Sequence, residues 1–413
     1  MKVEDRFLKY VSFTTTSDEN NECCPSTKQQ FELGKYIAEE LENIGLEQVK
    51  IDEHCYVYGL LPATPGHENE TPIGFISHMD TSPDFSGVNP KPQIIKNYDG
   101  SDVVLKGSGA VLSTKDFPTL ASLKGRTLIT TDGTTLLGAD DKAGIAEIVT
   151  AIEEIAEADR HAESRGYENL YGHRDIWVAF TPDEEIGRGA DKFDLDYFKA
   201  KYAYTVDGGY EGDLAYENFN AASAKFTIHG KSVHPGEAKG IMKNASLIAA
   251  EIAMVLPADE TPATTEMREG FYHLTDMQGD VDAATLSYIV RDHDKKIFEK
   301  RQEFLHKVAS EFNAKYGEGT VELELKHSYS NMLEIVEQYP EILERARRAI
   351  RATGTEVVSD PVRGGTDGSK LSFMGLPCPN LGTGGYGYHG PFEHVTVEGM
   401  ETVVKIIKNI ASC

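Results

Sequence analysis

The chain has 413 residues, of which 40% are hydrophobic and 26% are charged, which is the composition of a globular protein of two or three domains. Its formal net charge of -26 argues against nucleic acid and anionic membranes as partners, because both repel an acidic surface. No apolar run approaches the roughly 20 residues that a membrane span needs. Residues 1–10 carry no signal-peptide core, and the five scattered cysteines predict reduced thiols. We therefore expect a cytoplasmic protein.

The first half of the chain alternates helices and strands in the manner of an α/β domain with a mixed sheet flanked by helices. Ser26 or Thr27 is expected to cap the first helix, and Gly45 is expected to end it. The expected elements, in chain order, are a helix over 26–44, strands over 56–61 and 73–77, a long loop with short strands over 81–125, a helix over 141–158, a polar surface loop over 159–174, and strands over 175–180 and 202–206.

The character of the sequence changes near residue 217 and changes back near residue 328. Between these points the pattern predicts a small α+β sandwich inserted in the larger domain. We therefore expect residues 1–216 and 328–413 to form one catalytic domain and residues 217–327 to form an inserted lid. The expected elements are strands over 223–229, 284–291 and 321–327 and helices over 244–255 and 295–315 in the insert, followed by helices over 340–353, 367–374 and 402–410.

Five short segments carry acidic residues or histidine, and four of them follow a predicted strand or open a predicted helix, where open α/β sheets build their sites. His78 and Asp80 are two residues apart, so their side chains share one face of an extended segment. A carboxylate beside a metal-binding histidine can orient the histidine ring. The residues that bear this chemistry are His78, Asp80, Asp140, Glu184, Glu185, Asp207 and, far downstream, His389.

Each of these residues also has an ordinary explanation when it is taken alone. A histidine at a strand end or in a glycine-flanked loop is usually structural, and Asp140 fits a simple helix cap. Asp207 fits the start of a turn before its two glycines, and the adjacent glutamates 184 and 185 fit surface charge. Only the joint occurrence of the five segments, in this order, favours a metal site.

The five segments together resemble the di-zinc exopeptidases of the aminoacylase and glutamate carboxypeptidase type. Within that group the chain is most similar to the peptidase T family of tripeptide aminopeptidases. The resemblance spans nearly the whole chain and includes the segments 13–17, 230–236, 289–294 and 363–368. It implies two zinc ions per subunit, for which cobalt or manganese can substitute, a short peptide as substrate, and a homodimer formed through the lid. The polar stretch 159–174 is longer than the resemblance leads us to expect.

The resemblance also implies a role for each residue of the five segments. Asp80 would orient His78, and Glu184 would act as the general base toward a water shared by the two ions. A cis peptide bond is implied between the bridging Asp140 and Asp141. The implied ligands are His78, Asp140 and Asp207 for one zinc ion and Asp140, Glu185 and His389 for the other.

Four residues outside these segments are implied to contact the substrate, namely His234, Asn244, Arg291 and Arg363. His234 would stabilise the oxyanion from a partner subunit's lid, and its alternative is a turn histidine beside a proline. The guanidinium of Arg291 suits the substrate carboxylate, and its alternative is a surface ion pair with Asp292 or Asp294. Asn244 is a weaker candidate for the same pocket.

We therefore predict a metallo-aminopeptidase that hydrolyses the N-terminal residue from tripeptides. The main alternative is an N-acyl amino acid deacylase or desuccinylase of the same fold, which the metal ligands do not distinguish. A second alternative is a catalytically inactive metal-binding or scaffolding protein, and an intact Glu184 argues against it, because a structural site needs no base. No Gly-x-Ser-x-Gly elbow or comparable Cys/His signature competes with this prediction.

Overall fold

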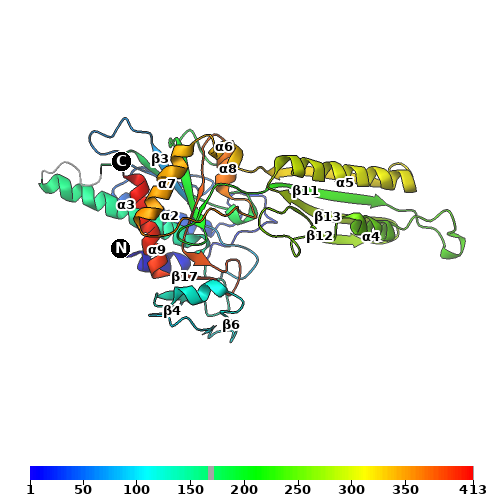
Figure 1. Ribbon diagram of the computed structural model, residues 1–413, viewed down its shortest axis with the longest axis horizontal. Helices are drawn as coiled ribbons and strands as arrows, with labels where there is room; N and C mark the ends of the chain where they lie inside the picture. Colours follow the sequence, from blue (N-terminus) through cyan, green and yellow to red (C-terminus); the bar gives the residue numbers. More distant parts are fainter. Residues whose placement is uncertain (166–171, 413) are drawn as a thin grey trace. The chain divides into compact units, whose positions relative to one another are not determined.

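The computed structural model describes residues 1–165 and 172–412 of the chain (Figure 1). They form two compact units. The first unit comprises Met1–Tyr216, Glu334–Ser359 and Thr366–Cys413, and the second comprises Glu217–Leu333 and Asp360–Gly365. The second unit thus includes a short later segment that the sequence analysis assigned to the larger domain, and the roles of the units as catalytic domain and lid stay predictions. No helix in the described part of the chain is long and apolar enough to cross a membrane.

The first unit is built on a seven-stranded sheet with the order β1-β2-β8-β3-β9-β15-β10. β3 pairs in parallel with β8 and β9, and β15 pairs in parallel with β9, whereas the outer pairs are antiparallel. The predicted mixed sheet is therefore confirmed. Its strands are β1 (Glu47–Ile51), β2 (Val57–Leu61), β3 (Ile73–His78), β8 (Ile176–Thr181), β9 (Tyr202–Gly208), β10 (Leu214–Ala215) and β15 (Asn380–Gly382).

Both faces of this sheet are covered, which is why β2, β3 and β8 are buried along their whole length. α3 packs against β3 and β9, and α9 contacts both α3 and α7 (Figure 1). Tyr58, Trp177 and Phe198 belong to a buried cluster that also includes Leu371 of α8. The helices of this unit are α1 (Val3–Val11), α2 (Gln30–Ile44), α3 (Ala139–Arg165), α7 (Pro340–Ala352), α8 (Asp367–Phe373) and α9 (Val397–Ala411), and α6 (Leu333–Val336) lies at the crossing between the units.

A second, smaller sheet of the first unit has the order β16-β17-β7-β4. Part of it comes from the region 81–125, where the sequence analysis predicted a long loop with short strands, and that prediction is confirmed. The elements are β4 (Gln93–Ile95), β7 (Leu128–Thr130), β16 (Gly385–Tyr386) and β17 (His394–Thr396), with the separate pair β5 (Val103–Val104) and β6 (Val111–Leu112) and the 3-10 turns η1 (Pro118–Leu123) and η2 (Glu184–Ile186).

The second unit is a four-stranded antiparallel sheet with the order β12-β13-β11-β14, packed against two helices (Figure 1). The side chains of β13 alternate between buried and less buried positions, because one face of the sheet joins the helices in a single core. The predicted α+β sandwich is confirmed. Its elements are β11 (Asn220–His229), η3 (Pro235–Glu237), α4 (Ala245–Val255), β12 (Phe271–Gly279), β13 (Ala283–Asp292), α5 (Lys295–Tyr316) and β14 (Val321–Tyr329).

Some local predictions are wrong. α2 begins at Gln30 and has no side-chain cap, because the hydroxyl of Ser26 donates to Asp183 and that of Thr27 donates to the carbonyl of Thr16. α3 continues through residues 159–165, which were expected to form a loop, and residues 166–171 lie outside the described part of the chain. By contrast, Gly45 ends α2 in the left-handed conformation, as predicted.

Candidate metal centre

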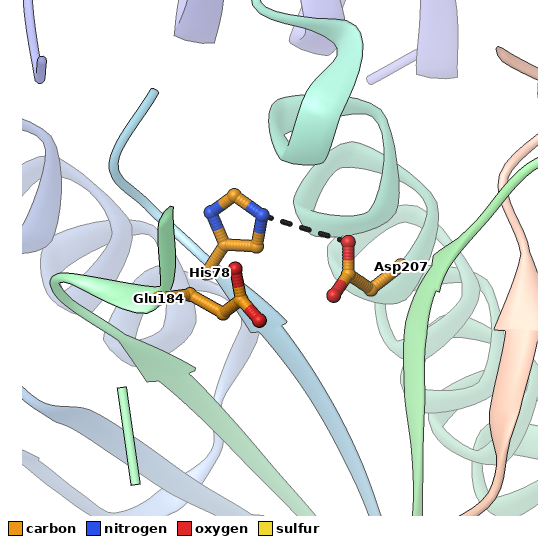
Figure 2. Close-up of side chains that lie close together, drawn as sticks. All are labelled: His78, Glu184 and Asp207. Atoms are coloured by element: carbon orange, nitrogen blue, oxygen red, sulfur yellow. Dashed lines mark ion pairs between the residues drawn. The ribbon is translucent and has the colours of Figure 1, made fainter. Parts of the chain in front are cut away.

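The histidine and carboxylate residues of the five segments meet at one edge of the large sheet in the first unit. His78 ends β3 and Asp207 lies near the end of β9, and these two strands are parallel neighbours. Their carboxyl ends therefore point to the same edge. Glu184 comes from the turn η2 that follows β8, and Figure 2 shows its side chain beside those of His78 and Asp207.

The ring of His78 is held from both of its nitrogens. Nδ1 lies 3.1 Å from the carbonyl oxygen of Asp80 and 3.3 Å from its carboxylate, so Nδ1 is the donor on that side. Nε2 lies 2.9 Å from Asp140 Oδ1 and 3.5 Å from Asp207 Oδ1, the second of which is drawn dashed in Figure 2. This orientation leaves Nε2 facing the cluster, as a ligand nitrogen must.

His389 approaches the same aspartate from the other side. Its Nε2 lies 3.0 Å from Glu185 Oε2 and 3.4 Å from Asp140 Oδ2. Its Nδ1 lies 3.2 Å from Asp84 Oδ2. Asp140 therefore presents one carboxylate oxygen to each histidine, which is the arrangement that a ligand shared by two ions requires.

Two groups of candidate ligands satisfy a common distance limit. The ligand atoms of His78, Glu184 and Asp207 lie within 4.8 Å of one another, and so do those of His78, Asp140 and Glu185. The first group contains Glu184, which the sequence analysis expected to act as a base rather than as a ligand. Glu184 thus lies close enough to the centre for either role.

Buried negative charge dominates the electrostatics of this cluster. Burial raises the pKa of Glu185 to about 8, with a contribution from Asp140, and burial raises that of Asp207 to about 6. Burial and the charge of Asp207 raise the pKa of Glu184 well above its usual range. Burial opposes ionisation of Asp140 as well, but the bonds from His389 and His78 keep its pKa below the usual range.

The donor set fits divalent cations. Four carboxylates face two imidazoles, and the buried Oε1 of Glu185 has no hydrogen-bond partner among the described residues. Buried carboxylate oxygen that is neither paired nor hydrogen-bonded is costly, and a metal ion is the usual remedy. Imidazole nitrogen and carboxylate oxygen are both good ligands for zinc. The peptide bond between Asp140 and Asp141 is cis, as the resemblance implied.

Three buried carboxylates support the cluster in ways that the sequence analysis did not foresee. Asp80 accepts hydrogen bonds from the backbone N–H groups of Glu184 (3.0 Å) and Glu185 (3.2 Å) in addition to its contact with His78. Asp183 accepts bonds from Ser26 and Gln30, and Glu393 accepts three bonds from the segment that ends in Asp140. Asp80 was expected only to orient His78, and for Asp183 and Glu393 the only sequence signal was their position beside the motif residues.

The four implied substrate contacts all lie in the second unit. His234 is exposed, opens the turn η3, and accepts a hydrogen bond from the N–H of Gly236 through Nδ1. Asn244 caps α4 by accepting from the N–H of Leu247. The guanidinium of Arg363 donates to the carbonyl oxygens of Met267 and Glu269, so it is already engaged.

Arg291 does not form the surface ion pair that was its alternative explanation. Asp292 pairs with Arg301 at 2.8 Å, and Asp294 caps α5. One Nη of Arg291 donates to the carbonyl oxygen of Arg363 at 2.8 Å. Its buried Nε has no hydrogen-bond partner among the described residues, so the guanidinium keeps a donor for a further acceptor.

The chain matches one family model over part of its length and known proteins over nearly all of it. Residues 216–320 match the model of the peptidase dimerisation domain. The chain is 53% identical to Peptidase T of Caldanaerobacter subterraneus subsp. tengcongensis, over 99% of this chain and 98% of that protein. It is 54% identical to Peptidase T of Clostridium perfringens (strain 13 / Type A), with the same coverage.

Solved structures share the fold at lower identity. Aminopeptidase PepT from Bacillus cereus has a TM-score of 0.76 at 22% identity, covering 99% of this chain and 97% of that one. A tripeptidase from Staphylococcus aureus has a TM-score of 0.74 at 20% identity, with the same coverage. A protein from Bacillus subtilis, described as a dinuclear metal binding peptidase from the M20 family, has a TM-score of 0.64 at 16% identity, covering 99% of this chain and 96% of that one.

Proposed function

The chain belongs to the peptidase T family, and on that premise we propose that it is a metallo-aminopeptidase that removes the N-terminal residue from tripeptides. The observation that carries this proposal is identity above 50% over 99% of the chain to proteins of that name. The cluster of histidine and carboxylate side chains in the first unit supports it, because a base lies beside the candidate ligands.

Two zinc ions are assigned to this cluster. His78 and Asp207 would hold one ion, Glu185 and His389 would hold the other, and Asp140 would be shared between them. When bound, the two ions lower the pKa of a water and polarise the scissile carbonyl. The support is the geometry of Asp140, whose Oδ1 lies 2.9 Å from His78 Nε2 and whose Oδ2 lies 3.4 Å from His389 Nε2.

Glu184 is assigned the proton transfers of the reaction. As the general base it takes a proton from the attacking water, and as the general acid it returns one to the leaving amine. Asp80 positions both Glu184 and His78, since one carboxylate binds the backbone of the first and faces the ring of the second.

The substrate is anchored at its far end by residues of the second unit. Arg291 is assigned to the substrate carboxylate, because its buried Nε is free to donate. His234 is assigned to the oxyanion from a partner subunit, and its exposure leaves the ring available. Asn244, which caps α4, and Arg363, whose guanidinium donates to the carbonyl oxygen of Met267, are proposed as further substrate contacts.

A homodimer formed through the second unit accompanies this function. The match to a peptidase dimerisation domain supports it. α4 exposes 63% of Leu247 and 85% of Met254, and β12 exposes Leu274 and Met277. Exposed apolar side chains of this size mark an interaction surface when they lie close together. Light scattering that finds only monomer at micromolar concentration would contradict the dimer.

One assay tests the proposed activity. Release of the N-terminal amino acid is measured from di-, tri- and tetrapeptides and compared with hydrolysis of N-acetyl and N-succinyl amino acids, with zinc supplied. The proposal expects tripeptides to be preferred and acylated amino acids to be inert. The reverse preference would establish the deacylase or desuccinylase instead. A cytoplasmic location is proposed on the expected reduced thiols, and the four cysteines of the described residues are free.

A further inference from the structure

Glu393 accepts three backbone hydrogen bonds beside the centre that no assigned role explains. Its side chain is buried, with 1% of the residue exposed. Oε2 accepts from the backbone N–H of Leu137 at 2.6 Å and of Gly138 at 2.8 Å, and Oε1 accepts from that of Asp140 at 2.9 Å. One carboxylate therefore satisfies three backbone donors in the segment that ends in Asp140.

We propose that Glu393 is a positioning residue that fixes the backbone of Leu137–Asp140 and, through its own loop, the ring of His389. Glu393 follows His389 by four residues, and the same short segment thus holds Asp140 twice. Glu393 binds the backbone N–H of Asp140, and His389 Nε2 lies 3.4 Å from its carboxylate. The proposal rests on the proposed function, because it takes Asp140 and His389 as metal ligands.

A carboxylate is the side chain that this geometry requires. Buried backbone N–H groups need an acceptor, and a carboxylate offers two oxygens to the three donors of this segment. A glutamine keeps the reach and one acceptor oxygen, but its NH₂ group meets one of the three donors. An aspartate keeps the charge and loses the reach, and an alanine loses both. We therefore expect metal affinity to be highest with Glu at position 393, lower with Gln, and lowest with Asp or Ala.

The chain offers a matched control in Glu147 of α3, the helix that carries Asp140. Glu147 is fully buried in α3, and neither of its carboxylate oxygens has a hydrogen-bond partner among the described residues. Glu147→Gln makes the same chemical change as Glu393→Gln, at the same degree of burial, without touching a backbone donor. It should leave metal binding as in the wild type.

The test uses the full chain with cobalt as the probe. Metal-free protein is titrated with Co²⁺ and the visible absorption of the bound ion is recorded. Partners of metal ligands typically contribute 10- to 100-fold to metal affinity. We expect Glu393→Asp and Glu393→Ala to weaken Co²⁺ binding by about that factor and to alter the spectrum at saturation, with Glu393→Gln in between. In the metal-free Glu393 variants, the backbone N–H groups of Leu137, Gly138 and Asp140 should exchange hydrogen faster than they do in the metal-free wild type.

The outcomes separate this proposal from the proposed function. A wild type that binds no Co²⁺ would defeat the metal assignment itself. A wild type that binds two ions, beside Glu393→Asp with the same affinity, spectrum and exchange rates, would overturn only the role of Glu393. If Glu393→Ala does not fold, Asp and Gln decide, because equal behaviour of these two would show that reach does not matter.

Discussion

Replacement of Asp80 by alanine tests how the centre is assembled. The carboxylate is fully buried and accepts from the N–H groups of Glu184 and Glu185, at 3.0 and 3.2 Å. Leaving a buried donor without a partner costs about 1–3 kcal/mol. Both hydrogen bonds are only partly buried, so we take the lower end of this range, about 1 kcal/mol for each N–H group. We therefore expect Asp80→Ala to lower the free energy of unfolding by about 2 kcal/mol. Metal affinity should fall by about 10- to 100-fold, because His78 loses its orienting partner.

The assay is urea unfolding of the metal-free protein followed by a metal titration. The control is Asp191→Ala, which removes a surface partner of Lys370 at 3.0 Å from a side chain that is 49% exposed. A surface pair of this kind contributes roughly 0–1 kcal/mol, and its loss should leave metal affinity unchanged. If Asp80→Ala unfolds at the same urea concentration as the control and binds metal as tightly as the wild type, the supporting role of Asp80 is refuted.

Four further predictions follow from the same structure. Chelation should abolish peptide hydrolysis, and zinc, cobalt or manganese should restore it; full activity in a sample shown by elemental analysis to be metal-free would exclude the metal mechanism. Glu184→Gln should keep two metal ions per chain and lose about 10²–10⁴-fold in kcat, whereas loss of one ion would make Glu184 a ligand. Arg291→Ala should raise KM for tripeptides and spare C-terminally amidated tripeptides, and equal losses on both would assign Arg291 elsewhere. Burial raises the pKa of Glu147 well above its usual 4.5. The contribution of Glu147 to stability is therefore fully present below pH 4.5 and is lost as the pH rises toward its folded pKa, while glutamine stays neutral. The advantage of Glu147→Gln in urea unfolding should grow by up to about 1.4 kcal/mol per pH unit, and a constant difference from pH 5 to 8 would refute this.

The regular elements with one buried face could be predicted from the sequence. α5 and the buried strands of the large sheet have apolar residues at the expected spacing, and they lie close to the predicted ranges. β12 was missed because it is an edge strand whose residues beyond Phe271 and Tyr272 are exposed, so no alternation marks it. α1 was also missed, although its buried residues, such as Phe7 and Tyr10, recur at helical spacing.

The failed cap of α2 shows why local chemistry can mislead. A serine shortly before a helical pattern is a good cap when nothing else needs its hydroxyl. Here Ser26 binds the buried carboxylate of Asp183 through both its N–H and its hydroxyl, each at 2.6 Å, and the helix begins four residues later without a side-chain cap. The tertiary contact has replaced the local cap. It ties Ser26 to the turn that carries Glu184, because Asp183 directly precedes Glu184 in that turn.

The supporting carboxylates lie beyond sequence reasoning for a related reason. Asp80, Asp183 and Glu393 accept hydrogen bonds from backbone groups that are 104, 157 and up to 256 residues away in the chain. Periodicity and motif spacing describe neighbours, so they identify the residues that face a metal and the nearby Asp80, but not the long-range contacts that hold these residues in place. Yet a ligand atom binds a metal well only when it lies within about 0.5 Å of its position, and that precision comes from the residues that hold the ligands in place. In this chain the segments that carry Asp140 and Glu184 are each fixed by a buried carboxylate from a distant element, so part of the net negative charge serves to position the centre rather than to bind metal or water.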